Sequence, residues 1–148
     1  MTARKGYEPI FIEPVFQKDS GDCAICCLVM LTGKPYPAVV AACPKEYLGK
    51  LYNPVKDGLT GKMMAEAAHK LGVTLSTYRK FDLYEDTGIL TVLKGHTRTQ
   101  KNKDKDTHAV ILVRGSIIDP ADGRYWPEVD TFLQVEEYRI GTIMKREE

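Results

Sequence analysis

The most apolar stretch of the chain, residues 23–31, directly follows a short polar turn at residues 18–22. No residue in this stretch is charged, and Gly33 lies just beyond it, at a position where helices commonly end. The polar turn is rich in residues that start helices. The pattern therefore predicts a short helix that is apolar on every face and buried in the centre of the domain.

Two later segments also have helical character. Residues 35–42 (PYPAVVAA) predict a second, shorter helix, because proline is tolerated in a first helical turn. Residues 60–71 carry methionine, alanine and leucine at helical spacing, between Thr60 as a cap and Gly72 as a stop. Between these helices, the glycines and prolines of residues 45–58 predict a loop with one weak helical turn.

The period of the apolar positions changes after Gly72, and the C-terminal half predicts strands. A tight turn at residues 114–115 joins two of these strands as a hairpin. The polar segment 94–106 predicts a solvated loop, and residues 7–16, with two prolines, predict an extended lead-in or edge strand. The strands are expected at 73–78, 88–93, 107–113, 116–119, 132–135 and 141–144.

Helices first and strands afterwards indicate an α+β fold, with the helices packed on one side of a mostly antiparallel sheet. A length of 148 residues is typical of one domain with a single core. No internal repeat, low-complexity tract or linker divides the chain. We therefore expect one domain over residues 1–148.

Charge and composition exclude several classes of protein. Lysine and arginine number 21 against 20 acidic residues, and a net charge of +1 argues against a nucleic-acid partner. No apolar run is long enough to span a bilayer, and the N-terminus lacks the apolar region of a signal peptide. The cytoplasm is the expected compartment, where the four cysteines, Cys23, Cys26, Cys27 and Cys43, are expected to be reduced.

The first candidate for chemistry is Cys23, which stands in the first turn of the predicted central helix. Free backbone N–H groups and the helix dipole favour a thiolate there, whereas the other three cysteines are expected to be buried apolar residues. The adjacent Asp22 would raise the pKa of this thiol unless it is directed away as the helix cap. Gln17, six residues earlier, can fold back and direct its amide at the same spot, which makes half of an acyl-transfer site.

The second candidate is His108, which opens the strongest strand of the chain, with Asp119 in the strand that follows. A turn at residues 114–115 places positions 108 and 119 opposite one another or one pair out of register. On the same face, the carboxylate can then orient the imidazole. The plainer interpretations are a strand-end histidine and an aspartate that initiates the turn before Pro120.

Taken in order, these motifs resemble those of papain-like cysteine peptidases, and most specifically the bacteriocin-processing (double-glycine leader) peptidase family. The resemblance lies in Gln17 six residues before Cys23, the apolar helix AICCLVML behind that cysteine, His108 in HAVIL, and Asp119 in DPADG. It spans roughly residues 10 to 125. It implies a papain-like α+β fold, in which an N-terminal central helix carries the nucleophile and packs on the C-terminal sheet.

The resemblance also assigns roles. It implies that Cys23 is the nucleophile and that His108 is its general base and later its acid. It implies that Asp119 orients His108, and that Gln17 and the Cys23 backbone N–H bind the oxyanion. The implied activity is hydrolysis of a peptide or amide bond in a peptide or protein substrate. No metal or organic cofactor is expected.

Other interpretations of the same residues remain open. Cys23 and Cys26 form a CxxC at a helix start, as in thioredoxin-like redox sites, although the accompanying βαβ pattern is absent. A zinc site would need further close ligands. A deamidase, an acyl transferase or a non-catalytic papain-like protein that blocks a partner could use the same constellation. Tyr125 and Trp126 are expected to pack in the core, and the lysines of residues 101–105 to form a solvated loop that could border the cleft.

Overall fold

The computed structural model describes residues 15, 17, 21–94 and 107–147. Its helices are α1 (Cys23–Thr32), α2 (Tyr36–Ala42), α3 (Pro54–Asp57), α4 (Gly61–Lys70) and α5 (Val129–Val135). A short hairpin, β1 (Glu46–Tyr47) and β2 (Lys50–Leu51), lies between α2 and α3. The main strands are β3 (Thr74–Tyr78), β4 (Thr87–Lys94), β5 (Thr107–Val113), β6 (Ser116–Asp119), β7 (Arg124–Trp126) and β8 (Tyr138–Glu147).

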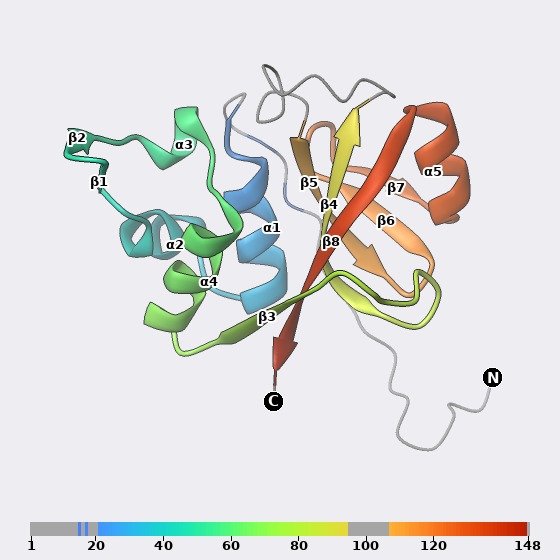
Figure 1. The fold of residues 1–148 in the computed structure, drawn as a ribbon, viewed down its shortest axis with the longest axis horizontal. Helices are drawn as coiled ribbons and strands as arrows, with labels where there is room; N and C mark the ends of the chain where they lie inside the picture. The colour runs from blue at the N-terminus through green and yellow to red at the C-terminus, as the bar shows by residue number, and fades with distance from the viewer. Residues whose placement is uncertain (1–14, 16, 18–20, 95–106, 148) are drawn as a thin grey trace.

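The main sheet has six strands in the order β3-β8-β4-β5-β6-β7, and every neighbouring pair runs antiparallel. Helices α1, α2 and α4 gather on one side of it, and α1 packs directly on β5 (Figure 1). This arrangement confirms the expected α+β, papain-like architecture, in which the helix that begins at Cys23 packs on the antiparallel C-terminal sheet.

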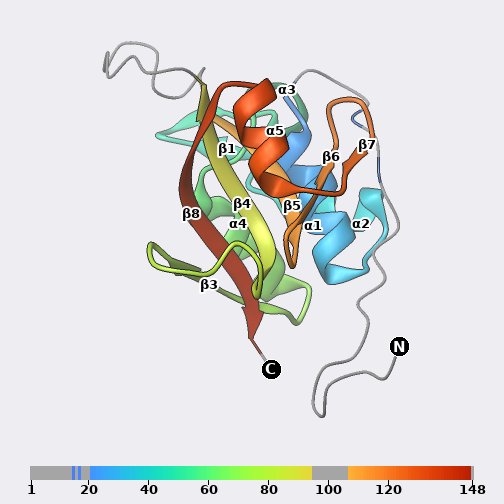
Figure 2. The ribbon, with the colours of Figure 1, turned by 90° about the vertical axis from the view of Figure 1, so that its right-hand side faces the viewer.

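The sheet is covered on both faces, which corrects the expectation that helices lie on one side only. Neighbouring residues of a strand point to opposite faces, so Ile111 and Ile118 pack with α1, α2 and α4. Their neighbours Leu112 and Ile117 pack instead with Phe132 of α5. Figure 2 shows α5 on the opposite side of β5 from α2 and α4. Near-continuous apolar strands are the sequence signature of such a two-faced core.

Helix α1 has the all-round burial that its sequence predicts. Seven of its ten residues are buried, Ile25, Cys26, Cys27 and Leu28 completely. Gly33 ends the helix in the left-handed conformation, with φ of 74°, and its N–H donates to the Val29 carbonyl at 2.9 Å. The predicted central helix is therefore confirmed, to within one residue at its C-terminal end.

The other two predicted helices are confirmed as α2 and α4. The Thr60 hydroxyl caps α4 by accepting a hydrogen bond from the Met63 N–H at 3.2 Å. Met63, Met64, Ala67 and Ala68 form the buried face of α4. The predicted helical turn within residues 45–58 is α3, whereas the β1–β2 hairpin beside it was not expected.

Two predictions for the C-terminal part are wrong. Residues 132–135 lie in helix α5 and not in a strand. The prediction failed because an apolar run this short shows no periodicity that distinguishes a helix from a strand. Tyr125 is 57% exposed, although Trp126 beside it is 5% exposed and buried as expected. Both belong to the unpredicted strand β7, where alternate side chains face opposite ways.

The predicted hairpin is confirmed, since β5 pairs with β6 from Ile111↔Ile118 to Val113↔Ser116. The remaining predicted strands appear in β3, β4 and β8. The expected lead-in at 7–16 and loop at 94–106 fall outside the described residues, apart from Val15 and Lys94. Of the helices described, none is long and apolar enough to cross a bilayer by itself. Helices α1 and α2 would meet these requirements of length and composition only as a pair, and the pair is bent by 112°.

Candidate active site

Cys23 is the first residue of α1 and is half-buried, whereas Cys26, Cys27 and Cys43 are at most 2% exposed. All four cysteines are free. Burial by itself would raise the pKa of Cys23. Hydrogen bonding to His108, the charge of His108, and backbone hydrogen bonds at Ala109 and Ala24 outweigh burial and lower this pKa below its ordinary value. The thiol that the sequence singles out is therefore the one whose environment favours the thiolate.

Asp22 stands at the N-cap position of α1 but makes no side-chain cap hydrogen bond. Its carboxylate is fully buried and accepts a hydrogen bond from the Tyr36 hydroxyl at 2.7 Å. The Cys26 thiol lies 3.9 Å from the same oxygen. The Tyr36 hydroxyl of α2 therefore binds this carboxylate, which does not act as the helix cap. No sequence pattern singled out Tyr36 as its partner.

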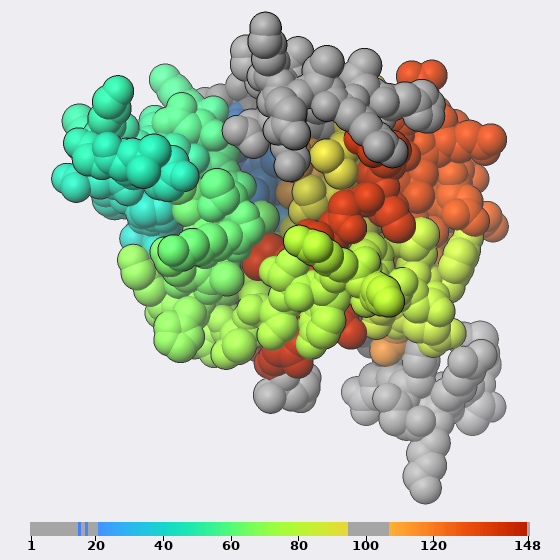
Figure 3. All heavy atoms as spheres, in the orientation of Figure 1, coloured from blue at the N-terminus to red at the C-terminus, as the bar shows by residue number. Residues whose placement is uncertain are grey.

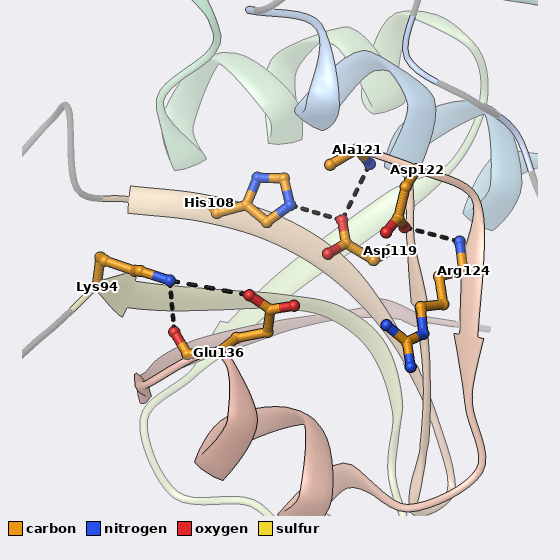
Figure 4. Close-up of polar contacts among 7 residues, drawn as sticks. All are labelled: Lys94, His108, Asp119, Ala121, Asp122, Arg124 and Glu136. Carbon is orange, nitrogen blue, oxygen red and sulfur yellow. Dashed lines mark hydrogen bonds and ion pairs between the residues drawn. The ribbon is translucent and has the colours of Figure 1, made fainter.

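His108 and Asp119 meet at one end of the β5–β6 hairpin. His108 Nε2 lies 2.7 Å from Asp119 Oδ1, and the side chains are 16% and 9% exposed (Figure 4). The Ala121 N–H donates to the same oxygen at 3.0 Å. Continuing the hairpin register by one residue places Asp119 across from Val110. Asp119 and His108 are therefore diagonal neighbours on the same face of the sheet.

Two acidic groups, Asp119 and Cys23, interact with His108 and control its protonation. Burial would lower its pKa, but hydrogen bonds and charge interactions with Asp119 and Cys23 raise the pKa of His108 to about 9. Burial would likewise raise the pKa of Asp119, and the His108 and Ala121 hydrogen bonds hold it below its ordinary value. The surroundings of His108 thus favour the imidazolium, and those of Cys23 favour the thiolate over the thiol more than in an ordinary cysteine.

Gln17 approaches the same corner of the sheet. Its backbone N–H donates to the Pro120 carbonyl at 2.8 Å, one residue after Asp119. The side chain is half-buried. Gln17 is therefore anchored beside the turn that follows Asp119, although it lies 102 positions earlier in the chain.

A pocket of about 410 Å³ adjoins Cys23. Tyr52, Gly58, Thr60 and Met64 line it from the helical side, and Thr91 and Ala109 line it from the sheet. In Figure 3, α1 is visible only deep between the helical part and the strands. Among the described residues that line the pocket, Asp57 is the one charged side chain. The pocket is large enough for a short extended segment of peptide.

The turn before Cys23 packs tightly on α3. A Cβ on Gly21 would lie 2.1 Å from the Lys56 carbonyl oxygen, and a Cβ on Gly58, in the pocket wall, would lie 3.6 Å from the Gly21 carbonyl oxygen. Glycine at position 21 therefore allows the turn before Cys23 and the pocket wall to pack together.

Replacing Gly21 with alanine is expected to lower the free energy of unfolding by about 1–3 kcal/mol, because the added methyl group forces the two backbones apart. Urea unfolding measures the effect. Gly61→Ala is the matched control, since a Cβ there has no atom within 4 Å and alanine favours the helix that Gly61 begins. Equal stabilities of Gly21→Ala and Gly61→Ala would contradict this packing.

Other residues considered for chemistry lie elsewhere. His69 is exposed on α4, and His96 falls outside the described residues. Within the described part of the chain, no three His, Cys, Asp or Glu side chains are grouped to hold a metal ion. Sequence reasoning missed Tyr138, the first residue of β8, whose ring stacks on His108. No local motif marks a tyrosine at the start of a strand as part of a site.

Comparisons with known proteins bear on this site. A family model, that of the Peptidase C39 family, matches residues 12–139. Among solved structures, the chain is similar to the crystal structure of the peptidase domain of Streptococcus mutans ComA, with 16% sequence identity and a TM-score of 0.47. That match covers 88% of this chain and 97% of the other. No curated protein matches. The family match confirms the resemblance seen in the sequence motifs.

Proposed function

Because this chain belongs to the Peptidase C39 family, we propose that it is a cysteine peptidase that uses Cys23, His108 and Asp119 as a catalytic triad. The observation that carries the proposal is the 2.7 Å contact between His108 Nε2 and Asp119 Oδ1, with the same imidazole hydrogen-bonded to Cys23. A nucleophile, a base and a group that orients the base are thus linked in one chain of contacts.

The first half of the reaction is acylation. The Cys23 thiolate attacks the carbonyl carbon of the scissile bond, and the carbonyl oxygen takes up the negative charge. The Gln17 side-chain amide and the Cys23 backbone N–H are the proposed donors to this oxyanion. His108 then gives its proton to the leaving amine, the C–N bond breaks, and the acyl group remains on Cys23 as a thioester.

Hydrolysis completes the cycle. Neutral His108 takes a proton from a water molecule, whose oxygen attacks the thioester carbon. The Cys23 thiolate leaves, the acid product is released, and His108 is again an imidazolium. Because Nε2 faces Asp119, proton transfer in both steps passes through Nδ1, the other ring nitrogen.

The pocket beside Cys23 suits an extended peptide. Its volume of about 410 Å³ and its threonine hydroxyls offer room and hydrogen-bonding groups for a few residues of backbone. We place the substrate acyl segment there and take a peptide or protein as the partner, with residues 1–148 as one catalytic domain. A reducing compartment such as the cytoplasm keeps the thiol of Cys23 available.

The proposal predicts that one thiol of the native protein reacts selectively. At pH 6, iodoacetamide is expected to label Cys23 at least about tenfold faster than the three buried cysteines, because only Cys23 combines access with a lowered pKa. Peptide mapping by mass spectrometry measures the four rates. Cys26→Ala is the matched control, and it should keep the fast site that Cys23→Ala removes.

The outcomes separate the competing functions. Slow and uniform labelling of all four thiols, without hydrolysis of a peptide library, would favour a non-catalytic binding protein. A reversible Cys23–Cys26 disulfide, seen as a mass loss of about two protons, would favour the redox interpretation. The burial of Cys26, which is 0% exposed, stands against that interpretation, since the partner thiol would have to be reached for exchange.

A further inference from the structure

The ring of Tyr138 stacks on the imidazole of His108. Their centroids lie 6.1 Å apart, and their planes differ by 20°. The two residues belong to strands that are not neighbours, because β4 lies between β8 and β5. Within β4, Val92 pairs with His108 and Lys94 pairs with Tyr138, so both rings project on the same face, beside each other at the end of the sheet.

Neighbours on that face hold the Tyr138 ring in turn. Phe132 of α5 lies against it with a centroid distance of 5.4 Å. The Lys94 ammonium lies 4.9 Å from the centroid of the ring and donates to the Glu136 carbonyl at 2.6 Å. Figure 4 shows Lys94 reaching Glu136, to which it also pairs through the carboxylate at 3.8 Å. A ring held in this way presents a fixed surface to the imidazole.

We propose that Tyr138 is a positioning residue of the site. Its ring holds the His108 imidazole in the plane that directs Nε2 to Asp119 and Nδ1 to Cys23, and it keeps water from the His108–Asp119 contact. The proposal rests on the proposed function, because it concerns the protonated form of His108 that the reaction needs.

The hydrogen bond to Asp119 by itself does not fix the imidazole. It anchors one nitrogen, and the ring can still rotate about the axis through that nitrogen, which moves Nδ1 away from the thiol. A flat aromatic surface on one side removes this rotation. The negative face of a phenol ring also stabilises a cation stacked on it, so the contact favours imidazolium over neutral imidazole.

The charged groups around His108 come from several elements. Asp119 faces it from β6, Cys23 from α1 and Tyr138 from β8, with Lys94 and Glu136 behind the tyrosine ring. Burial, followed by the negative charges of Asp119, Glu136 and Cys23, raises the pKa of Tyr138 to about 12. The phenol thus stays neutral below pH 10, and a pH profile measured there reports Cys23 and His108.

The test is the pH profile of Cys23 alkylation by iodoacetamide in the full chain, from pH 5 to 9. Tyr138→Leu removes the ring and is expected to shift the pH of half-maximal alkylation rate upward by about one unit. Tyr138→Phe keeps the ring and should stay within about twofold of the original protein at every pH. The matched control is Tyr78→Leu, which removes the tyrosine under Lys145 in the edge strand β3.

A purely structural role would lower thermal stability without moving this profile. Tyr138→Met, which fills the space with a flexible chain, gives the same test if the leucine variant does not fold. An unshifted profile in a folded variant without the ring would overturn the proposal, and so would an equal shift in Tyr138→Phe. If Cys23 of the original protein is not selectively labelled at pH 6, the proposed function fails. If it is labelled and loss of the ring has no effect, only the role of Tyr138 fails.

Discussion

Replacing His108 with alanine is expected to lower peptide hydrolysis by about 10⁴-fold, because the triad loses the group that moves the proton. Alkylation of Cys23 by iodoacetamide at pH 6 should also slow, by roughly tenfold. The hydrogen bond and positive charge of His108 lower the pKa of this thiol, and a thiol of ordinary pKa is only about 0.3% ionised at pH 6. The lower intrinsic nucleophilicity of a stabilised thiolate offsets part of the loss.

Rates of iodoacetamide labelling and cleavage of a peptide library, both read by mass spectrometry, check this prediction. His69→Ala is the matched control, because that histidine is exposed on α4 and should leave both rates unchanged. If His108→Ala retained a labelling rate within about threefold of the original protein, the thiolate of Cys23 would not depend on His108. The ion pair at the centre of the proposed mechanism would then be absent.

Replacing Asp119 with asparagine is expected to lower the pKa of His108 by at least about one unit from its value of about 9. The sign follows from charge: the carboxylate stabilises the imidazolium, whereas a neutral amide does not, so the proton leaves at lower pH. Part of the elevation should remain because Cys23 still faces the ring. NMR titration of the imidazole nitrogens measures the pKa directly, without a substrate.

The same substitution should move the alkaline limit of hydrolysis to lower pH, because acylation needs protonated His108 to give its proton to the leaving amine. Asp122→Asn is the matched control. Asp122 is exposed in the neighbouring turn, where its carboxylate accepts a hydrogen bond from the Arg124 N–H at 2.9 Å (Figure 4). If the two variants left the pKa of His108 equally high, the charge of Asp119 would not be what raises it.

The sequence predicted those parts of the fold that local patterns control. The charge-free run after Asp22 and the glycine at position 33 were enough to define α1, and Thr60 was enough to define the start of α4. The hairpin around residues 114–115 predicted that His108 and Asp119 meet, because only 11 positions separate them and a tight turn fixes the pairing.

Helix α5 shows where local patterns fail. The apolar residues at 132–135 are too few to display a helical or a strand period, and only their contacts separate the two. Phe132 is completely buried against the second face of the sheet, beside Trp126. The sequence therefore did not predict the second core or the contact of Phe132 with the Tyr138 ring.

By itself, the sequence determined which side chains could react. They are a cysteine at a helix start, a histidine at a strand start, and an aspartate in the other strand of the same hairpin. The tertiary structure alone decided that the carboxylate of Asp22 is bound by Tyr36 and that Tyr138 lies against the imidazole. The reason is physical. Periodicity and turn chemistry act over a few residues, whereas these contacts depend on how whole faces of helices and strands pack, and no local pattern encodes that packing.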